Sequence, residues 1–507
     1  MGGLAAACDL ARQGCDVTLL ERAEAPGGKM RQVEVDGRLI DAGPTVFTMR
    51  WVFEGLFGDA GARLEDRVRL SPASVLARHA WSATERLDLF ADKARSADAI
   101  GTFAGAVEAR GFLAFCAEAR RIYATLEAPF LKAPLPTMVS LTRGVGRLQD
   151  MLALKPFQTM WTAIGQHMRD PRLRQLFGRY ATYCGSSPFL APATLMLVAD
   201  VEQQGIWLPE GGMRAVAQAV ADLAASLGAT IRCGEHVAGI VMAGGRASGV
   251  RLASGEEVHA DAVVLNADPQ AVAAGLFGRE VARAVPRTPA SARSFSALTW
   301  TGVAETSGFP LHYHTVLFSS DYRAEFDALA RGAPPGGPTV YICAQDRDDA
   351  GAAPGGPERL LILMNAPATG DSQTMTDTET DRCAKTVLSL LDRCGLQIRS
   401  DLSGMTPTTP AGFDRLFPAT GGALYGPAVH GSMATFRRPG SRTAIPGLYL
   451  AGGATHPGAG VPMAALSGRL AASALMADLG STRPSRTTAT SGGTSTRSAM
   501  TGSTASR

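Results

Sequence analysis

The first 30 residues of the chain, MGGLAAACDLARQGCDVTLLERAEAPGGKM, contain half of a dinucleotide-binding unit. Gly2 and Gly3 lead into an alanine-rich stretch with helical periodicity. A short apolar strand, Val17 to Leu20, follows and ends at Glu21. In a dinucleotide-binding fold, an acidic residue at the end of the second strand, about 20 residues past the glycine turn, accepts hydrogen bonds from a ribose. The spacing therefore predicts an α/β fold in which Gly2, Gly3 and Glu21 contact a dinucleotide.

The first strand of such a unit, and the first two glycines of its G-x-G-x-x-G turn, have no counterpart before Gly2. Gly3 can take the third glycine position, where the absence of a side chain lets helix and strand pack closely. We therefore expect a natural start about ten to fifteen residues upstream, which would supply a strand of ordinary length. Taken alone, the half motif has an alternative reading as an ordinary helix–strand unit.

The bulk composition excludes several classes of protein. A length of 507 residues suits two or three packed lobes, and 46% hydrophobic residues supply a large core. The net charge of +3 is nearly neutral, so we expect no nucleic-acid partner. Eight scattered cysteines without a CxxC pair predict reduced thiols and no zinc site. No secretory signal is visible, and the uncharged stretch 443–468 is too rich in proline and glycine for a spanning helix.

Two more glycine turns follow Glu21 at short intervals. The first carries a lysine, and the second contains a proline and a threonine. Glycines let backbone N–H groups approach a ligand, and a cation beside them can face a phosphate or a developing negative charge. The residues that these turns add to the predicted cofactor site are Gly27, Gly28, Lys29, Gly43, Pro44 and Thr45.

Near the C-terminus, the stretch GLYLAGGATHPGAGVP (447–462) predicts a strand, a glycine-rich loop and the start of a helix. A helix N-terminus offers unpaired N–H groups and the positive end of a dipole to an anionic ring system. Other motifs lie in between: LPEGGMRAVAQAVA (208–221), GEHVAGIV (234–241) and VVLNADP (263–269). The C-terminal residues that we assign to the cofactor site are Gly452, Gly453, Gly460, Val461, Pro462 and Met463.

The order of these motifs, from residue 1 to about residue 470, resembles the FAD-binding flavoproteins of the amine-oxidase group and, most closely, the carotenoid (phytoene) desaturase family. The resemblance implies an α/β fold with an FAD-binding Rossmann-like domain of the GR2, amine-oxidase-like type. An interleaved α+β substrate domain and a helical cap complete the implied fold. The resemblance also implies non-covalently bound FAD, with the backbone of Val237 holding the adenine.

Six segments are expected from this resemblance together with the pattern of helices and strands. The C-terminal segment is rich in Ser, Thr and Arg, without an acidic residue or an apolar period, which predicts disorder. The expected segments are an FAD-binding domain in three parts (1–95 with its first strand missing, 206–290 and 406–480), a helical cap region (96–205), a substrate domain (291–405) and a disordered tail (481–507).

The stretch YCGSSPFLAPATLMLVADVEQQGIWLPEGGM (183–213) most resembles family members of photosynthetic bacteria that desaturate hydroxylated or methoxylated acyclic carotenoids. The resemblance implies an FAD-dependent oxidoreductase that removes two hydrogens from adjacent carbons of such a carotenoid, a 3,4-desaturation. Tyr183, Ser186 and Ser187 are the candidate substrate residues. A structural turn is the alternative role of the two serines. Glu210 stands where relatives often carry a basic residue, which leaves its part in substrate binding open.

Other functions share parts of this pattern. A different carotenoid desaturase, such as a phytoene desaturase, would use the same cofactor and fold, as would an amine or protoporphyrinogen oxidase. A non-catalytic prenyl-lipid-binding chaperone on the same scaffold would lack flavin, and the retention of Glu21 and the 452–463 loop argues against it. The electron acceptor stays open between a quinone and oxygen.

Histidines supply the candidate for a catalytic side chain. Of the eight histidines, His456 alone lies in a flavin motif, and we assign it the catalytic role, with orientation of its loop as the alternative. His312 and His314 lie on one face of an expected strand. Because no third ligand is evident, we predict no metal site there.

The segment APFLKAPLPTMVSL (128–141) is apolar, broken by prolines, and carries one cation, Lys132. Such segments can lie in a membrane interface. Because carotenoids are insoluble in water, we expect the substrate to enter from the bilayer and the protein to bind the cytoplasmic side of the membrane peripherally. Phe130 and Leu131 are the predicted contact residues. An internal cap over the substrate tunnel is the alternative role of this segment.

Overall fold

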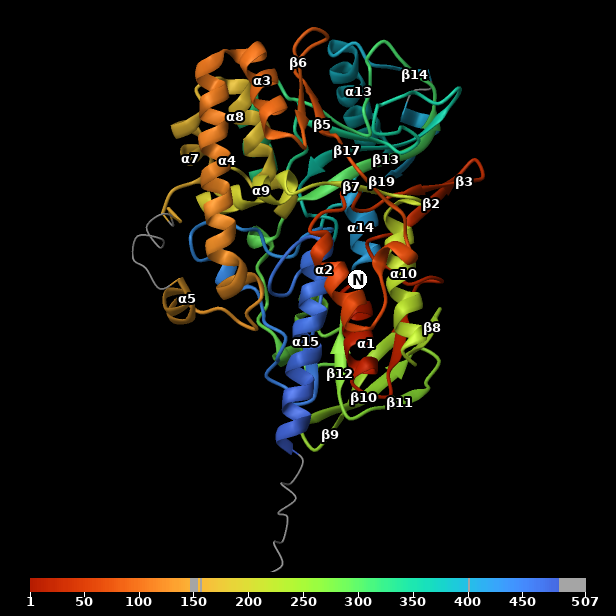
Figure 1. Cartoon of the computed structure of the whole chain (residues 1–507). Coiled ribbons are helices and arrows are strands. Elements are labelled where there is room, and N and C mark those ends of the chain that lie inside the picture. The colour runs from red at the N-terminus through yellow and green to blue at the C-terminus, as the bar shows by residue number, and fades with distance from the viewer. Residues whose placement is uncertain (146–153, 156, 400–401, 483–507) are drawn as a thin grey trace, which may run out of the picture.

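The computed structural model describes residues 1–145, 154–155, 157–399 and 402–482. These residues form two halves, one above the other in Figure 1. The lower half contains the first and last helices with short parallel strands. The upper half contains a large mixed sheet with a group of helices beside it. The predicted α/β class with a helical cap is confirmed.

Parallel strand pairs build the lower half. β1 (Thr18–Glu21) pairs in parallel with β8 (Thr230–Cys233), and β12 (Val263–Leu265) pairs in parallel with β20 (Leu448–Leu450). The runs Val-Val-Leu and Leu-Tyr-Leu suit parallel strands, which are covered on both faces. Within the described residues, the two pairs form separate sheets.

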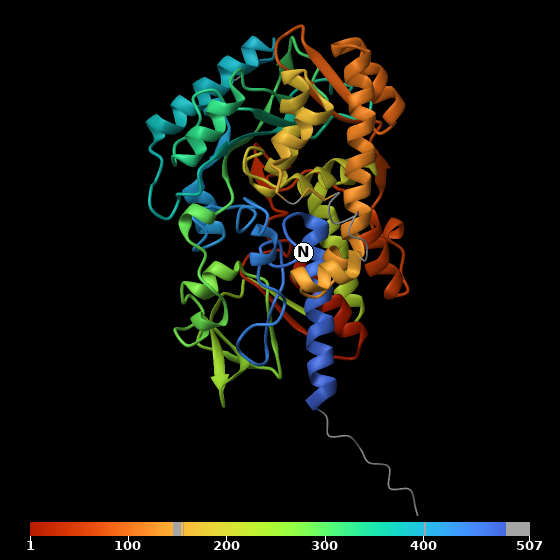
Figure 2. The same cartoon turned by 90° about the vertical axis from the view of Figure 1, so that its left-hand side faces the viewer.

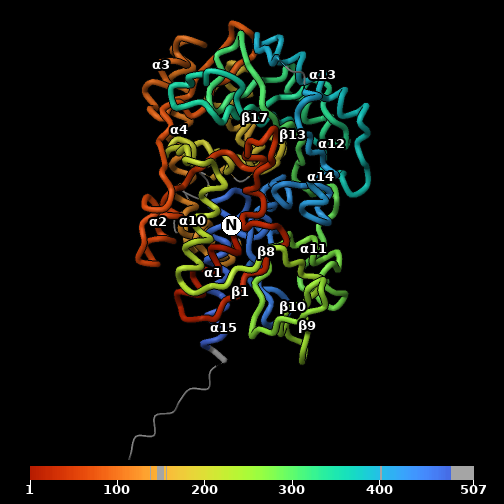
Figure 3. The backbone as a smooth tube through the Cα atoms, turned by 90° about the vertical axis from the view of Figure 1, so that its right-hand side faces the viewer, coloured from red at the N-terminus to blue at the C-terminus, as the bar shows by residue number. Residues whose placement is uncertain are grey.

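Three helices pack on these strands. α1 (Gly2–Arg12) contacts both α10 (Gly212–Ser226) and α15 (Val461–Thr482). In Figures 1 and 3, α1 and α15 run side by side. A Cβ atom at Gly468 of α15 would overlap the carbonyl oxygen of Gly2, so only glycine permits this close contact. The first and last helices of the described chain therefore form one packed unit.

Antiparallel elements flank the parallel strands. The predicted hairpin at Asp36-Gly37 is confirmed, because both residues have positive φ angles, 50° and 73°, as a two-residue turn of this kind requires. The predicted turn at Ser254-Gly255 also joins two paired strands. The antiparallel strands of these regions are β2 (Gln32–Val35), β3 (Arg38–Asp41), β4 (Leu70–Pro72), β7 (Trp207–Pro209), β9 (Val237–Ala243), β10 (Arg246–Leu252) and β11 (Glu257–His259).

A seven-stranded sheet forms the centre of the upper half. Its order is β19-β13-β17-β16-β15-β5-β6, and its neighbours are antiparallel except β15 and β5. One face packs on α13, and the other turns toward the helical cap. The strands of this half are β5 (Val75–Ala80), β6 (Arg86–Phe90), β13 (Ser296–Ala304), β14 (Thr306–Ser307), β15 (His314–Leu317), β16 (Val340–Ala344), β17 (Glu358–Ala366), β18 (Gln397–Ile398) and β19 (Thr406–Thr408).

The cap is built around α4, whose buried face carries Phe112, Phe115, Ala119 and Ile122 at helical spacing. It lies on the side of the molecule that faces the viewer in Figure 2. The remaining helices are α2 (Arg50–Asp59), α3 (Lys93–Ala104), α4 (Ala106–Leu126), α5 (Met138–Val145), α7 (Met160–His167), α8 (Pro171–Gly178), α9 (Leu197–Gln203), α11 (Pro269–Ala273), α12 (Tyr322–Ala330), α13 (Asp377–Arg393) and α14 (Pro410–Leu416).

The chain passes between the two halves more than once, which is the interleaving that the sequence predicts. The boundaries of the six expected segments stay predictions. Of the predicted tail 481–507, residues 481 and 482 extend α15, and the rest lies outside the described residues. None of the described helices combines the length and the apolarity needed to cross a bilayer.

Candidate cofactor and substrate site

Asn266 joins the N-terminus of α1 to the loops that follow β12 and β20. Its Oδ1 accepts a hydrogen bond from the backbone N–H of Gly3 at 2.9 Å, and its Nδ2 donates to the carbonyl oxygen of Ala451 at 2.8 Å. A Cβ at Gly2 would lie only 2.9 Å from both Asn266 Nδ2 and the backbone nitrogen of Gly452. The predicted residues Gly2, Gly3 and Gly452 are therefore brought together. No acidic side chain occupies the first turn of α1, so its positive end is free to face an anion.

Glu21 and Val237 lie at the same end of the paired strands β1 and β8. The carboxylate of Glu21 accepts a hydrogen bond from the N–H of Ala23 at 2.9 Å, and its carbonyl oxygen accepts one from Glu235 at 2.9 Å. Val237 begins β9 two residues after Glu235. Glu21, which is predicted to contact the ribose, and Val237, which is predicted to contact the adenine, therefore lie near each other in the fold.

The two glycine turns after Glu21 contact each other. A Cβ at Gly43 would overlap the carbonyl oxygen of Lys29, so the second turn can lie against the first only with glycine here. Nζ of Lys29 donates to the carbonyl oxygen of Leu424 at 2.5 Å and lies 5.0 Å from the centre of the Phe417 ring. Burial lowers the pKa of Lys29, and nearby Asp268 opposes that shift. The buried side chain of Lys29 thus belongs to the turn that the sequence predicts to contact the cofactor.

The C-terminal loop reaches the same region. Nη1 of Arg438 donates to the carbonyl oxygen of Gly453 at 3.0 Å, and α15 begins at Val461. Among the described residues, the buried hydroxyl of Thr455 in this loop has no hydrogen-bond partner, and neither has Nη1 of Arg214 beside Gly27. Polar atoms of this kind are rarely left unpaired in a folded protein. The orphaned groups, the close glycines and the two helix N-termini fit a dinucleotide cofactor with a pyrophosphate and an electron-accepting ring.

His456 is placed differently from its predicted catalytic role. Its Nε2 bonds with the carbonyl oxygen of Ala133 at 3.0 Å, and its ring lies edge-on to Phe130 at 5.1 Å. Burial lowers the pKa of His456 to about 4, so the ring is neutral near pH 7. These contacts correspond to the alternative role, which is to fix the loop against segment 130–133. The catalytic role stays a prediction.

Thr45 is the first residue in a series of polar contacts that continues into the substrate half. Its Oγ1 lies 2.7 Å from Oη of Tyr341 in β16, and that oxygen lies 2.7 Å from Nδ1 of His314 in β15. Burial lowers the pKa of His314 to about 3, so its imidazole is neutral. His312 precedes the strand, and its Nε2 bonds with the carbonyl oxygen of Asp349 at 3.1 Å. In the part of the chain that the structure describes, no three side chains of the metal-binding types are grouped to hold an ion.

The three predicted substrate residues have different surroundings. Oη of Tyr183 donates to Glu202 at 2.8 Å and accepts from Arg179 at 2.8 Å. Ser186 instead accepts from the N–H of Val429 at 2.8 Å, and Oγ of Ser187 accepts from the N–H of Phe189 at 3.3 Å. Backbone partners of this kind indicate the alternative role of the serines as turn residues, and their substrate role stays a prediction.

Sequence reasoning missed Arg179, Glu202, Tyr341 and Asn266 as site residues. Asn266 lies in the motif VVLNADP, so that motif could have identified it. Glu210, whose part was open, is exposed and lies 3.5 Å from Arg69 on the surface. It does not approach the residues described above.

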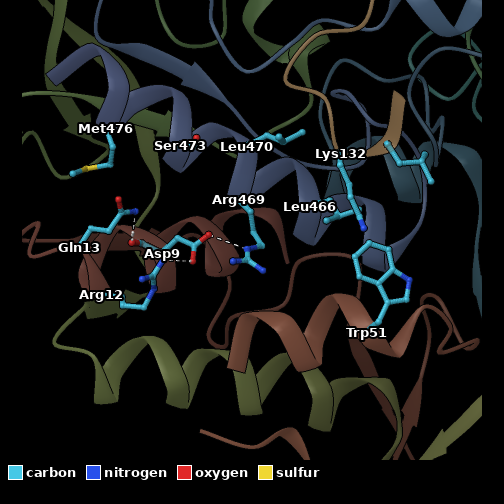
Figure 4. A pocket seen from close by; sticks show the side chains of 11 residues that line it. Asp9, Arg12, Gln13, Trp51, Lys132, Leu466, Arg469, Leu470, Ser473 and Met476 are labelled. Atoms are coloured by element: carbon cyan, nitrogen blue, oxygen red, sulfur yellow. Dashed lines mark hydrogen bonds and ion pairs between the residues drawn. The ribbon is translucent and has the colours of Figure 1, made fainter. Parts of the chain in front are cut away.

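A pocket of about 450 Å³ lies away from these residues, against α1, α2 and α15 (Figure 4). Asp9 and Arg469 form an ion pair at 3.0 Å in its wall, and Lys132 lies 4.6 Å from the ring centre of Trp51. Its lining is strongly charged, which does not suit a hydrocarbon. We therefore do not assign the substrate to this pocket.

The fold and this arrangement of groups define an FAD-dependent oxidoreductase. The chain belongs to the flavin-containing amine oxidoreductase family, whose model matches residues 1–476. FAD is its cofactor. The chain is 54% identical over 506 residues to the hydroxyneurosporene desaturase of Rubrivivax gelatinosus, covering 99% of this chain and 96% of the relative. The predicted membership of the carotenoid desaturase family is confirmed.

Two further comparisons agree. The chain is 45% identical over 482 residues to the hydroxyneurosporene desaturase of Cereibacter sphaeroides, covering 95% of this chain and 97% of the relative. An oxidoreductase structure from Methanosarcina mazei has the same fold, with a TM-score of 0.56 at 14% identity, covering 94% of this chain and 98% of that one. The similarity to the solved structure supports the fold assignment. The sequence identity to the two desaturases supports the family assignment.

Proposed function

We propose that this protein desaturates an acyclic carotenoid that carries a hydroxyl or methoxyl group at one end, forming a double bond near that end (3,4-desaturation of the hydroxyneurosporene type). The observation that carries the proposal is the similarity to hydroxyneurosporene desaturases over 99% of the chain. The buried polar residues near Thr45 support it, because an otherwise apolar interior needs polar groups to bind a substrate oxygen.

FAD, when bound, accepts a hydride from a saturated carbon next to the polyene. The positive charge left on the substrate is delocalised, so the proton on the neighbouring carbon does not need a strong base. His314 and His456 are neutral because burial lowers the pKa of each, to about 3 and about 4. In this proposal the described residues orient the substrate and exclude water, and none of them has to act as a strong base.

The test uses liposomes that contain either hydroxyneurosporene or neurosporene, with and without an added quinone. We expect the absorption of the hydroxylated substrate to move to longer wavelength, and neurosporene to react more slowly. Equal turnover of both carotenoids would refute the end-group assignment. Turnover of neither, despite bound flavin, would refute the desaturase assignment. Amine-dependent peroxide formation would indicate an amine oxidase, and purified protein without a flavin spectrum would indicate a lipid carrier.

The electron acceptor is a quinone in our proposal, with oxygen as the alternative. A quinone is dissolved in the same bilayer as the substrate. Faster turnover with quinone under anaerobic conditions supports this acceptor. Turnover that requires oxygen and ignores quinone contradicts it.

Membrane binding is proposed for a surface around α5. Exposed apolar side chains occur on α5 and just before it, and also on three segments that bond to one another: Met160 N–H donates to Ala191, and Gly431 N–H donates to Leu190. Apolar groups of this kind are typical of interfacial contacts. The side chains that form this apolar face, with their exposed fractions, are Leu135 (55%), Val139 (60%), Phe157 (91%), Leu190 (51%) and Met433 (44%).

The predicted contact residues Phe130 and Leu131 are wrong, because they are only 7% and 4% exposed. Phe130 packs on Phe436 and His456, so it belongs to the interior. Lys132 is half-exposed and pairs with Glu127 at 3.0 Å. Segment 128–141 thus has an internal part first and an exposed apolar part after it, and the exposed part supports the proposed membrane contact.

Flotation with liposomes tests the apolar face. The variant Leu135→Ser/Val139→Ser/Phe157→Ser should float less than the unaltered protein. The matched control is Val107→Ser/Leu113→Ser, which removes exposed apolar groups from the opposite part of α4, about 20–28 Å from its end near α5. Equal flotation of all three proteins would contradict this surface as the contact. Peripheral location on the cytoplasmic side is part of the same proposal.

A further inference from the structure

A buried arginine with unused hydrogen-bond donors lies between the helical cap and the sheet. Arg179 directly follows α8 (Figure 1) and is 6% exposed. Its Nη1 donates to Oη of Tyr183 at 2.8 Å, whereas Nε and Nη2 have no hydrogen-bond partner among the described residues. A guanidinium has five N–H donors, and leaving buried ones unpaired is destabilising. These donors are therefore available to a partner beyond the described residues.

Glu202 holds the arginine in place. One of its carboxylate oxygens accepts a hydrogen bond from Tyr183 at 2.8 Å, and the other accepts one from Tyr180. Nη2 of Arg179 lies 3.8 Å from the oxygen that Tyr183 uses, so the two charges neutralise each other. The pair can therefore sit beside an apolar molecule without adding net charge to the interior.

The inner face of the seven-stranded sheet lies opposite this pair. Tyr341 and His79 are each in register with Val316, and side chains alternate between faces, so these residues share the inner face with His314. The positive charge of Arg179 contributes, after burial, to lowering the pKa of both histidines. Nε2 of each histidine also has no hydrogen-bond partner in the part of the chain that the structure describes. Buried polar atoms without a partner among the described residues thus occur both on Arg179 and on the sheet face that carries His79 and His314.

Two tyrosines near Arg179 and His314 are less buried than their neighbours. Tyr183 and Tyr341 are half-buried, although Tyr180 and His314 beside them are closed to solvent. Tyr341 also contacts Thr45 in the turn 43–45 of the cofactor site. Hydrogen bonds therefore join the cofactor side of the molecule to Tyr341 and His314, and the charge of Arg179 acts on the second of these residues.

We propose that Nε and Nη2 of Arg179 donate hydrogen bonds to the oxygen at the end of the carotenoid and so determine the preference for an oxygenated substrate. The assignment rests on the proposed function for the identity of that substrate. In a 1-hydroxylated chain, the oxygen is three bonds from the nearer carbon of the 3,4 bond. A group that binds this oxygen must accordingly lie close to the cofactor, and Thr45 of the cofactor site is hydrogen-bonded to Tyr341, which bonds with His314 on the sheet face. A hydroxyl and a methoxyl oxygen can both accept from a guanidinium.

The test measures binding as well as turnover. Quenching of tryptophan fluorescence gives Kd for 1-hydroxyneurosporene and for neurosporene, with the flavin-loaded protein in detergent micelles. We expect the unaltered protein to bind the hydroxylated form about tenfold more tightly, and the ratio to fall to about one in Arg179→Met. Arg174→Met, an arginine on α8 that stacks on Trp161, is the matched control and should keep the ratio.

A second variant covers the case in which Arg179→Met does not fold because Glu202 is left unpaired. Arg179→Met/Glu202→Gln removes both charges together and should also lose the preference. An unchanged Kd ratio in either folded variant would overturn the proposal and would indicate that an internal water satisfies Arg179. If the unaltered protein prefers the hydroxylated form in binding but converts neither carotenoid, the desaturase function fails and the assignment of Arg179 stands. If it shows no preference in binding, the assignment of Arg179 fails whatever the turnover.

Discussion

Oγ1 of Thr45 and Oη of Tyr341 lie 2.7 Å apart, although the residues come from different halves of the molecule. Tyr341→Phe removes this contact and the bond to His314. We expect a loss of about 1–3 kcal/mol in the free energy of unfolding, because two buried polar groups lose their partner. Urea unfolding measures it. Tyr322→Phe is the control, since the buried Tyr322 hydroxyl has no hydrogen-bond partner among the described residues. Equal effects of the two variants would argue against a structural bond at Thr45.

Gly43→Ala should prevent FAD binding. The added methyl group would overlap the carbonyl oxygen of Lys29, so the turns 27–29 and 43–45 could not keep their contact. The flavin content of the purified protein, read from its visible spectrum, should fall by tenfold or more by our estimate. Gly336→Ala is the matched control, because a Cβ there meets no neighbouring atom. A normal flavin content in Gly43→Ala would show that this contact is not needed.

Glu21→Gln should weaken FAD binding by roughly tenfold, because a neutral amide accepts hydrogen bonds from ribose hydroxyls less strongly than a carboxylate does. The Kd is measured by titrating flavin-free protein with FAD and following flavin fluorescence. Glu24→Gln, an exposed carboxylate three residues away, is the control and should not change the Kd. In the unaltered protein, acid precipitation should release all flavin, and colour on the pellet would contradict non-covalent binding.

His456 should make the protein less stable in mild acid. Its pKa is about 4 in the folded chain because of burial, against about 6.5 when unfolded. The unfolded chain therefore binds the extra proton first, and the contribution of His456, complete above pH 6.5, is lost as the pH falls toward 4. Between pH 7.5 and pH 5, the loss is about 2 kcal/mol.

Urea unfolding at these two pH values measures the loss. His456→Gln can keep a donor for the carbonyl of Ala133 but cannot titrate, so its stability should fall less over the same interval. Part of the pH dependence will persist in the variant, since burial also lowers the pKa of His79 and His314. Identical pH dependence of the variant and the unaltered protein would show that His456 does not contribute.

The cofactor half of the molecule was predictable because its functional groups are local in sequence. Gly2, Gly3 and Glu21 lie on one helix–strand unit, and the spacing of a short motif fixes where each of them points. The hairpin at Asp36-Gly37 was predictable for the same reason, since two residues determine that turn. The resemblance to a known family then indicated that these local motifs belong to one cofactor site.

The substrate half could not be predicted in the same way. Arg179, Glu202 and Tyr341 come from separate segments and meet only through the packing of the cap on the sheet. The burial of Phe130 likewise depends on Phe436 and His456, some 300 residues later in the chain. Hydropathy identified an apolar segment there but not which of its side chains face inward. Residues that meet through long-range contacts have no characteristic spacing in the sequence, so a single sequence does not show that they are in contact.

The contact between Gly2 and Gly468 has a consequence for how the protein is made. At about 5–20 residues per second, a ribosome needs roughly 20–90 s to reach α15 after it has finished α1. Throughout that interval, the apolar side chains of α1, such as Leu4 and Ala5, lack the partner that covers them in the finished protein. The substrate half can begin to fold during translation, whereas the cofactor half cannot be completed until synthesis is nearly over. Until α15 has been made, a nascent chain lacks the loop 452–460 and the helix N-terminus that complete the cofactor site.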